Sequence, residues 1–536
     1  MPPSRPARPL VLSFEDGPPD PPLPPGLPGQ RAARALPWSA PLVGQSFAPP
    51  PPEVIVLHRA GFGPRPGDAE RVRTIGVAAY LDEQLMPESI PDPDCDRRIA
   101  ALAPQLTNLA VPALWLRRNL PDWRNQWQAF WETRTLAWLR AIYSRRQLFE
   151  LLVDHWHNVF NVYAAQAPMV ILWPDHDRRI RRNVFGNYRA FLEEIATSPA
   201  MLYYLDNSSS SAAGPNENFA RELLELYTLG EAAYRPGTTP SEGNPAATYN
   251  DADVVAVARC FTGWTIRDRS WDSAFGDTGE FFIYAPWHDD GEKRVLGVRV
   301  PASQSALKDG RDVLDLLARH PATARQVATR LARRLVADRP TAGLVDAGAA
   351  EYLRQIDAPD QLRRVVRALL THPDALSAWG EKVRRPFEAI VGFLRATNAE
   401  WTWTDPFDWL TASAGQRLWE WTAPNGYPDV RSAWTSSVQL VGRWSQFNSL
   451  AENWVEGTVI PILSVTPAGL RSPLELSAFW VERLLGYLPP EGDWEPLVRF
   501  LARGRDPSLP LTSDQIATRL PALMAMVFQL PGSQLR

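Results

Sequence analysis

The strongest hydrophobic pattern in the chain lies between residues 147 and 165, in the stretch QLFELLVDHWHNVFNVYAA. At 100° per residue its apolar side chains cover roughly two-thirds of a helical circumference, which predicts a buried helix. What remains is a narrow polar seam with the i, i+3, i+4 and i+7 spacings of one helix face. The seam consists of Gln147, Glu150, Asp154, His157, Asn158 and Asn161. On so apolar a helix, we expect this thin stripe to line a cleft, a cation or another polar helix.

A second helix is predicted in the stretch GPNENFARELLELYTLG. Pro215 stands where a first helical residue is favoured, and Gly230 stands where a glycine usually follows a helix. Opposite the apolar face, the seam spacings recur at Asn218, Arg221, Glu222 and Glu225. A solvent-exposed face explains the same pattern, because Glu217, Arg221 and Glu225 form an i, i+4 ladder of alternating charge.

Helical periodicity dominates most of the remaining sequence, so we predict a mainly α, multi-helix globular body. One exception lies near residues 280–300, where EFFIYAPWHDDGEKRVLGVRV predicts two short strands around a turn, a small β-hairpin insertion. Residues 1–53 hold PPDPPLPPGLPGQ and FAPPPPE, which predict a Pro-rich N-terminal tail, either flexible or strapped across the body. Residues 54–453 form the predicted helical domain, and residues 454–536 a C-terminal helical extension packed on the same body.

Composition narrows the classes of function. The 536 residues carry a net charge of −4, so neither nucleic acid nor an anionic membrane is the expected partner. The two cysteines, Cys95 and Cys260, cannot form a disulfide framework, which is typical of a reducing compartment. No apolar run reaches the roughly 18 residues of a membrane span, and no signal-peptide core follows Arg5 and Arg8. The 22 tryptophans are spread along the chain, which favours packing anchors over sugar-stacking platforms.

Several stretches carry a family resemblance by their order along the chain. They include DHWHNVFNVYA, FGNYRAFLEEIATSPAMLYYLDN, NENFARELLELYTLG, HDDGEKRVLG and PNGYPDVRSAW. From Val54 to Asn453 the sequence resembles the domain of unknown function 1800 family. The resemblance implies a mostly helical bacterial protein, often encoded beside a partner with a sulfatase-like or alkaline-phosphatase-like fold. Many members look exported, whereas this sequence shows no signal peptide, so we expect a cytoplasmic protein.

Common catalytic motifs are missing from the sequence. It contains no Gly-x-Ser-x-Gly elbow of a serine hydrolase, no HExxH motif of a zinc protease, no Walker loop for a nucleotide and no haem motif. The two seams instead offer carboxylate, amide and imidazole groups, which suit a divalent cation such as Mg²⁺, Ca²⁺ or Mn²⁺ between helices. The predicted metal ligands are Asp154, His157, Asn158, Glu222 and Glu225. Additional members of this site would be Asp206, Asn218, Arg221, His288 and Asp289.

Two functions remain open at this level. The first is a metal-assisted hydrolase, in which the cation activates water or polarises an ester and His157 or Glu222 carries the proton. The second is a non-catalytic scaffold that binds a partner such as a protein of sulfatase-like fold. In the scaffold, the seams form a buried Asn, Glu and Arg network that fixes the register of the helices. The pattern leaves the oligomeric state open.

Overall fold

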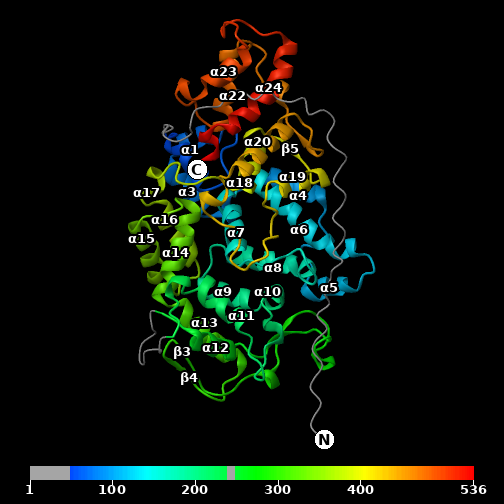
Figure 1. The fold of residues 1–536 in the computed structure, drawn as a ribbon, viewed down its shortest axis with the longest axis vertical. Helices are drawn as coiled ribbons and strands as arrows, with labels where there is room; N and C mark the ends of the chain where they lie inside the picture. The colour runs from blue at the N-terminus through cyan, green and yellow to red at the C-terminus, as the bar shows by residue number, and fades with distance from the viewer. Residues whose placement is uncertain (1–48, 238–247) are drawn as a thin grey trace. The chain divides into compact units, whose positions relative to one another are not determined.

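Helices make up most of the computed structural model, which describes residues 49–237 and 248–536 (Figure 1). The prediction of a mainly α fold is confirmed. The predicted Pro-rich tail falls on residues 1–48, which lie outside the described ranges, and on a few residues before and within the first helix. No helix in the described ranges is both long and apolar enough to pass through a membrane.

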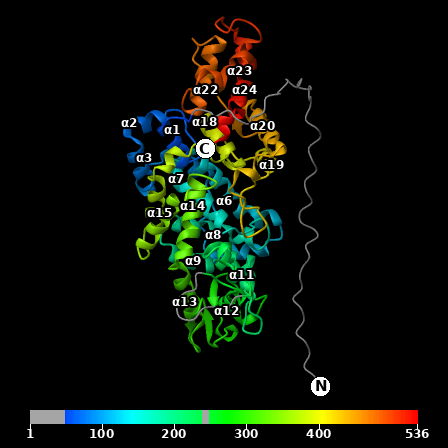
Figure 2. The same ribbon diagram turned by 60° about the vertical axis from the view of Figure 1, so that its left-hand side comes forward.

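The first half of the chain is almost entirely helical. Its helices are α1 (Pro52–Arg59), α2 (Asp68–Ile75), α3 (Val77–Gln84), α4 (Pro93–Leu102), α5 (Val111–Trp115), α6 (Trp123–Tyr143), α7 (Gln147–Val159), α8 (Met169–Asn183), α9 (Tyr188–Ala196), α10 (Pro199–Tyr204), α11 (Glu217–Glu222) and α12 (Asp251–Cys260). Helix α7 is the predicted buried helix, and it packs against α3, α6 and α8 (Figures 1 and 2).

The second half adds helices on several sides of this group. They are α13 (Ala306–Ala318), α14 (Pro321–Leu335), α15 (Ala342–Arg354), α16 (Gln361–Leu370), α17 (Asp374–Ser377), α18 (Pro386–Ala396), α19 (Asp405–Ser413), α20 (Ser437–Ala451), α21 (Ile462–Val465), α22 (Pro473–Leu485), α23 (Glu491–Ala502), α24 (Ser513–Gln529) and α25 (Pro531–Gln534). Helix α18 packs on α6, α22 packs on α18, and α24 packs on α20. The C-terminal helices therefore share one buried apolar cluster with the rest, from Val54 to Phe528.

Helix α7 begins at Gln147 as predicted but ends at Val159, six residues before the predicted end. The residues that follow leave the helix because their polar groups contact another segment. The Ala164 amide donates to the Trp419 carbonyl over 2.9 Å, and the Asn161 side chain donates to the carbonyls of Trp421 and Ala423. Tertiary contacts thus replace the last turn and a half of the predicted helix.

The second predicted helix is split in two. Helix α11 starts after the N-cap Asn216, whose side chain accepts a hydrogen bond from the Asn218 amide. A π-helical turn, Leu223–Tyr227, then continues from it. Gly230 has a φ of 93°, in agreement with its predicted place just beyond the helix. Turns of π-helix are rare and frequently mark functional positions, so Glu225 on this turn and Glu222 just before it are candidates for a functional site.

Within the described residues the strands form three two-stranded antiparallel sheets, one of which is a hairpin in the predicted region near 280–300. Their strands are β1 (Trp264–Ile266) with β2 (Phe281–Ile283), β3 (Lys293–Val295) with β4 (Val298–Val300), and β5 (Glu400–Trp401) with β6 (Thr458–Val459). The expectation that the two strands around the HDDG turn pair with each other was wrong, because β2 pairs with β1 and β3 pairs with β4. Leu296 and Gly297 both have positive φ values, as the two-residue β3–β4 turn requires.

The contact between α13 and β1 leaves no room for a side chain at Gly310. A Cβ atom there would lie 2.3 Å from the buried ring of Trp264. Gly310→Ala should therefore lower the free energy of unfolding by roughly 1–3 kcal/mol, although alanine favours helix. The matched control is Gly343→Ala in α15, where a Cβ would meet nothing within 4 Å. There we expect no loss and a gain of up to about 1 kcal/mol. Urea unfolding of both variants tests this, and equal midpoints would contradict it.

Candidate functional site

The first part of the α7 seam is paired with helix α8. Both Glu150 carboxylate oxygens accept hydrogen bonds from Arg181 Nη1, over 3.1 and 3.0 Å. Arg181 Nε also donates to Asp177 Oδ2 over 2.8 Å. The other Asp177 oxygen lies 2.9 Å from His157 Nε2. These carboxylate and imidazole groups are buried, so Glu150, Arg181, Asp177 and His157 form one internal chain of polar contacts.

This arrangement keeps Asp177 ionised. Burial alone would raise the pKa of its carboxyl, but the neighbouring Arg181 and His157 outweigh burial and hold that pKa below its usual range. The His157 ring is also enclosed by aromatic neighbours, with centroids 5.3 Å from Trp173 and 5.0 Å from Trp419. His157 therefore serves as the partner of an internal carboxylate in a water-poor environment.

The next seam residue, Asp154, faces two arginines of the second half of the chain. Its Oδ2 accepts a hydrogen bond from Arg334 Nη2 over 3.1 Å and another from Arg385. Arg334 also contacts Glu388 over 2.6 Å and Asp429 over 3.7 Å.

A buried ion network extends from these contacts. Glu388 is paired with Arg536 as well as with Arg334. Lys382 lies 3.2 Å from Asp429 and 2.8 Å from Asp338. Together the ion pairs join α7, α14, α18 and the C-terminal segment. Burial would raise the pKa of Glu388, but Arg334, Arg536 and Arg385 outweigh it and lower that pKa well below its usual range.

The two asparagines of the seam hold a long non-helical segment, residues 416–430, which we name the seam loop. Asn158 bonds the Tyr427 backbone twice, donating to its carbonyl over 2.8 Å and accepting from its amide over 2.7 Å. Asn161 donates to the Trp421 and Ala423 carbonyls over 2.9 and 2.7 Å. The loop approaches α7 so closely that a Cβ at Gly426 would lie 2.1 Å from the Asn158 carbonyl oxygen.

The carboxylates predicted on the second helix lie elsewhere, at its partly exposed face. Glu222 and Glu225 are both half-buried on α11 and the π-helical turn. Burial, and then repulsion by Glu225, raise the pKa of Glu222 to about 7, against a small opposing effect of Arg221. Arg221 itself contacts Glu217 over 3.3 Å and Asp251 over 3.6 Å, with 36% of its side chain exposed. The exposed-ladder interpretation of Arg221 thus fits its position.

The remaining predicted residues are fixed in their own surroundings. Asp206 lies two residues beyond the end of α10 and has a φ of 58°. Burial raises the pKa of Asp206, and a hydrogen bond from the Asn218 side chain partly offsets that rise. In the HDDG turn, Asp289 accepts two hydrogen bonds from Arg259 over 2.6 and 3.0 Å. His288 Nε2 lies 3.3 Å from Asp309, which also pairs with the buried Lys293 over 2.6 Å.

The structure does not bring the predicted metal ligands to one point. Within residues 49–237 and 248–536, no group of three or more His, Cys, Asp or Glu side chains is placed to hold a metal ion. The physical reason is that arginines already occupy the carboxylate of Asp154, while Asp177 holds His157 and the seam loop holds Asn158. The spacing within each helix identified the polar faces correctly, but it could not show that the two seams face different surroundings.

The partners that sequence reasoning missed are Asp177, Arg181, Arg334, Arg385 and Glu388. Local signals for them existed in the i, i+4 pair of Asp177 and Arg181 on α8 and in the i, i+3 pair of Arg385 and Glu388 at the start of α18. The pairs between helices join residues far apart in sequence, such as Asp154 and Arg385, and no local pattern indicates them.

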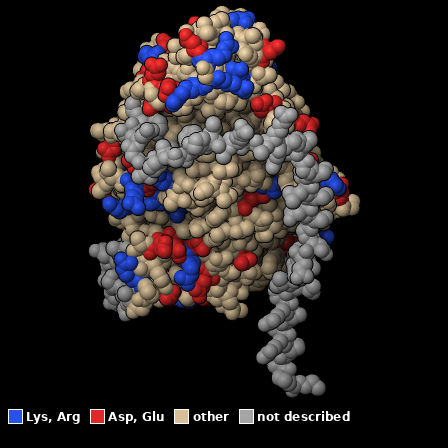
Figure 3. Space-filling model, turned by 45° about the horizontal axis from the view of Figure 1, so that its top comes forward, with Lys and Arg blue, Asp and Glu red and all other residues tan. Residues whose placement is uncertain are grey.

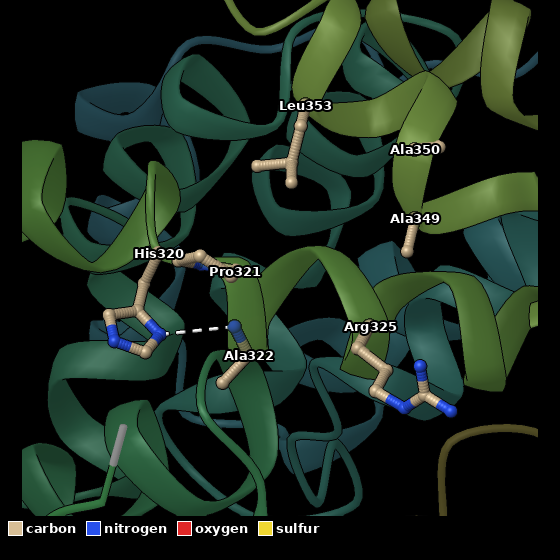
Figure 4. A pocket seen from close by; sticks show the side chains of 7 residues that line it. All are labelled: His320, Pro321, Ala322, Arg325, Ala349, Ala350 and Leu353. Atoms are coloured by element: carbon tan, nitrogen blue, oxygen red, sulfur yellow. Dashed lines mark hydrogen bonds between the residues drawn. The ribbon is translucent and has the colours of Figure 1, made fainter. Parts of the chain in front are cut away.

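A cavity of about 710 Å³ lies between the start of α14 and the end of α15, and none of the predicted site residues lines it (Figure 4). Its walls are mainly apolar, from Pro321, Ala322, Ala349, Ala350 and Leu353, with His320 and Arg325 at their edges. His320 caps α14 by accepting a hydrogen bond from the Ala322 amide over 3.1 Å. On the face seen in Figure 3, acidic and basic side chains are both spread over the surface.

Fold and site together define a mainly helical protein whose central helix is held by buried ion pairs and by a loop bonded to its asparagines. The chain belongs to the family described as "Protein of unknown function (DUF1800)", which matches residues 55–535. The match confirms the sequence resemblance and reaches beyond Asn453 to include the C-terminal helices. No curated protein and no solved structure matches the chain.

Substitution of Glu388 tests whether the ion network is buried in solution. Glu388→Gln should lower the free energy of unfolding by roughly 3–5 kcal/mol, because Arg334 and Arg536 lose the carboxylate that they share. Glu217→Gln is the matched control, since it removes a carboxylate from the exposed pair with Arg221. We expect that change to cost less than about 1 kcal/mol. Similar denaturation midpoints for the two variants would show that the network is not buried in solution.

The raised pKa of Glu222 predicts a pH-dependent effect of Glu222→Gln. The folded state binds the Glu222 proton more tightly than the unfolded state, whose pKa is near 4.5. The wild type therefore loses stability as the pH rises from about 4.5 to about 7, and the glutamine variant does not. At pH 8 the variant should be more stable than the wild type by about 1 kcal/mol, after allowance for solvent around this half-exposed group. At pH 4 that gain should vanish. Thermal melts across this pH range test it, and a difference independent of pH would contradict it.

Proposed function

We propose that this protein is a non-catalytic scaffold that binds a protein partner. The observation that supports the proposal is that every polar side chain of the α7 seam is paired inside the protein. Even Gln147, at the start of the seam, donates to the Ala141 and Ser144 carbonyls and accepts from the Phe62 amide. Each seam side chain thus has at least one partner within the protein, which supports a structural role for the seam.

The energetic cost of placing a metal ion at Asp154 also supports the scaffold. A divalent cation at Asp154 would have to displace Arg334 and Arg385 from its carboxylate. Both guanidinium groups are almost fully buried, with 0% and 2% of their side chains exposed. Leaving such cations without a partner costs several kcal/mol, which opposes metal binding there.

The paired seam also fixes the register of α7. A shift by one residue would rotate the helix by about 100° and move it by about 1.5 Å. Glu150, Asp154 and Asn158 would then all leave their partners, which lie on α8, on α14 and α18, and in the seam loop. Only one register satisfies the three contacts together, so the seam acts as a positioning device.

The stretch from Val438 to Leu463 supplies a surface for a partner. It holds five of the six most exposed large apolar side chains in the described ranges, the sixth being Leu116. The five are Val438 (83%), Trp454 (73%), Val441 (59%), Val459 (57%) and Leu463 (57%). We propose that these side chains contribute to the contact with a partner, because large exposed apolar groups mark interaction sites where they lie together. By the family resemblance, the partner would be a protein of sulfatase-like or alkaline-phosphatase-like fold encoded beside this one.

Co-expression with that neighbouring protein tests the partner. We expect a stable complex by size-exclusion chromatography with light scattering, and weaker association with Trp454→Ser, because a large exposed aromatic side chain would anchor the contact. Leu116→Ser is the control, since it removes a similarly exposed apolar side chain, 63% exposed, from another part of the chain. Absence of a complex, or equal loss with both variants, would contradict this surface.

Chelation tests the scaffold against the metal enzyme. Because arginines hold the carboxylate of Asp154, EDTA should leave the melting temperature unchanged, and Asp154→Asn should destabilise the protein with or without EDTA. A stoichiometric divalent cation in the purified protein, combined with a chelator-induced fall in melting temperature that Asp154→Asn abolishes, would overturn the scaffold.

A second candidate function, a metal-assisted hydrolase, rests on Glu222 alone. Its pKa of about 7 suits proton transfer near neutral pH, and it lies next to Glu225 on a π-helical turn. His157 would not act with it, because its imidazole is paired with Asp177. Ester hydrolysis that requires added Mg²⁺ or Mn²⁺ and is lost in Glu222→Gln would support this candidate.

A further inference from the structure

A small polar cavity lies at the N-terminal end of α7, lined by residues of α2, α3 and α18 and of the segments that precede α2 and α7. Its volume is about 50 Å³. A single water needs roughly 10–15 Å³ on the same measure, so the cavity has room for several waters or for one small polyatomic ion. Four arginines line it: Arg65, Arg71, Arg145 and Arg395.

The cavity contains more positive than negative charge. Against the four arginines it has two carboxylates, Asp68 and Glu83. Glu83 forms an ion pair with Arg71. Asp68 accepts a hydrogen bond from the Arg65 backbone amide over 2.8 Å, and the Arg395 Nη2 lies 3.6 Å from it, which is longer than a hydrogen bond. The Arg65 guanidinium donates to the Ile142 carbonyl and forms no ion pair with Asp68.

Burial makes this excess charge costly. Arg395 is 3% exposed, and its guanidinium donates to the carbonyls of Gly63 and Ile142. Burial first, and then repulsion by Arg65, lower its pKa to about 9. Burial lowers the pKa of Arg65 as well. Two neighbouring cations in such a place are stabilised by any anion that enters the cavity.

A hydroxyl group also faces the cavity without a partner. Tyr80 lines it and is 5% exposed, yet its hydroxyl forms no hydrogen bond with another residue of the described chain. The Tyr80 hydroxyl oxygen is not one of the fully enclosed polar atoms of the described chain, so it keeps access to the cavity. As a donor, it completes a set of groups that would all bond to an oxygen anion.

We propose that this cavity binds a free tetrahedral oxyanion, phosphate or sulfate. Arg65 and Arg395 supply buried charge, Tyr80 donates a hydrogen bond, and the more exposed Arg71 and Arg145 attract the ion from solvent. Guanidinium groups suit this chemistry because their planar N–H groups match the edges of phosphate and sulfate. The small volume selects the free ion over an ester, whose organic group would need space that the cavity lacks.

Calorimetric titration of the full-length protein with sodium phosphate or sodium sulfate tests the proposal, with sodium chloride at the same ionic strength as the reference. We expect saturable binding of phosphate or sulfate and none of chloride. Tyr80→Phe is the deciding variant because it keeps the packed ring and removes only the hydroxyl. It should raise Kd about tenfold, the effect of losing one hydrogen bond to a charged group. Arg145→Gln should weaken binding too, with a fold that is intact by circular dichroism.

Arg97→Gln is the matched control. Arg97 lies on α4 with 74% of its side chain exposed and does not line the cavity, so its loss should leave Kd unchanged. Arg395→Gln is a less clean variant, because it also removes hydrogen bonds to backbone carbonyls. Absence of saturable binding, or wild-type affinity in both Tyr80→Phe and Arg145→Gln, would overturn the proposal. Phenyl phosphate binding as tightly as phosphate would overturn the assignment to the free ion.

Discussion

The structure depends on the pairing of buried charges around Glu388. This carboxylate is 2% exposed and accepts contacts from Arg334 and Arg536. Through Arg334 and Arg385 the same network reaches Asp154 on α7. Buried ion pairs add little net stability compared with apolar packing of the same volume, but a broken pair is costly. The network therefore acts mainly as a constraint: α7, α14, α18 and the C-terminal segment can pack together only in the arrangement that pairs every charge.

The seam loop extends this constraint from charges to the backbone. A non-helical segment that packs against a buried helix must find partners for its own amides and carbonyls. Asn158 and Asn161 supply them for Trp421, Ala423 and Tyr427. The close approach at Gly426 is possible because glycine has no Cβ and accepts a φ of 71°. Polar residues on an otherwise apolar helix thus allow a loop to lie where a helix would normally pack.

Sequence periodicity predicted what depends on local order and missed what depends on distant partners. The helical fold and the start of α7 followed from the 3.6-residue period, which burial imposes on any packed helix. The end of α7 did not, since the seam loop competes for residues 160–165. Strand positions near 281 and 293 were visible, but their partners were not, because pairing depends on β1 and β4 outside that turn. For the site, spacing showed which side chains share a face. It could not show that arginines lie opposite Asp154 while Glu222 is half-buried at a separate, partly exposed face.

Arginine side chains gather at two places in this fold, around Glu388 and around Arg395, and the two places differ in how many carboxylates they contain. Around Glu388, ion pairs link Arg334, Lys382, Arg385 and Arg536 to the four carboxylates of Asp154, Asp338, Glu388 and Asp429. Around Arg395, the cavity is lined by four arginines and by the carboxylates of Asp68 and Glu83, with Asp92 also nearby. A buried cation without a close carboxylate is costly because it is desolvated. The excess of arginines at the second place therefore favours an anion there, whereas the ion pairs at the first fix the packing of the helices.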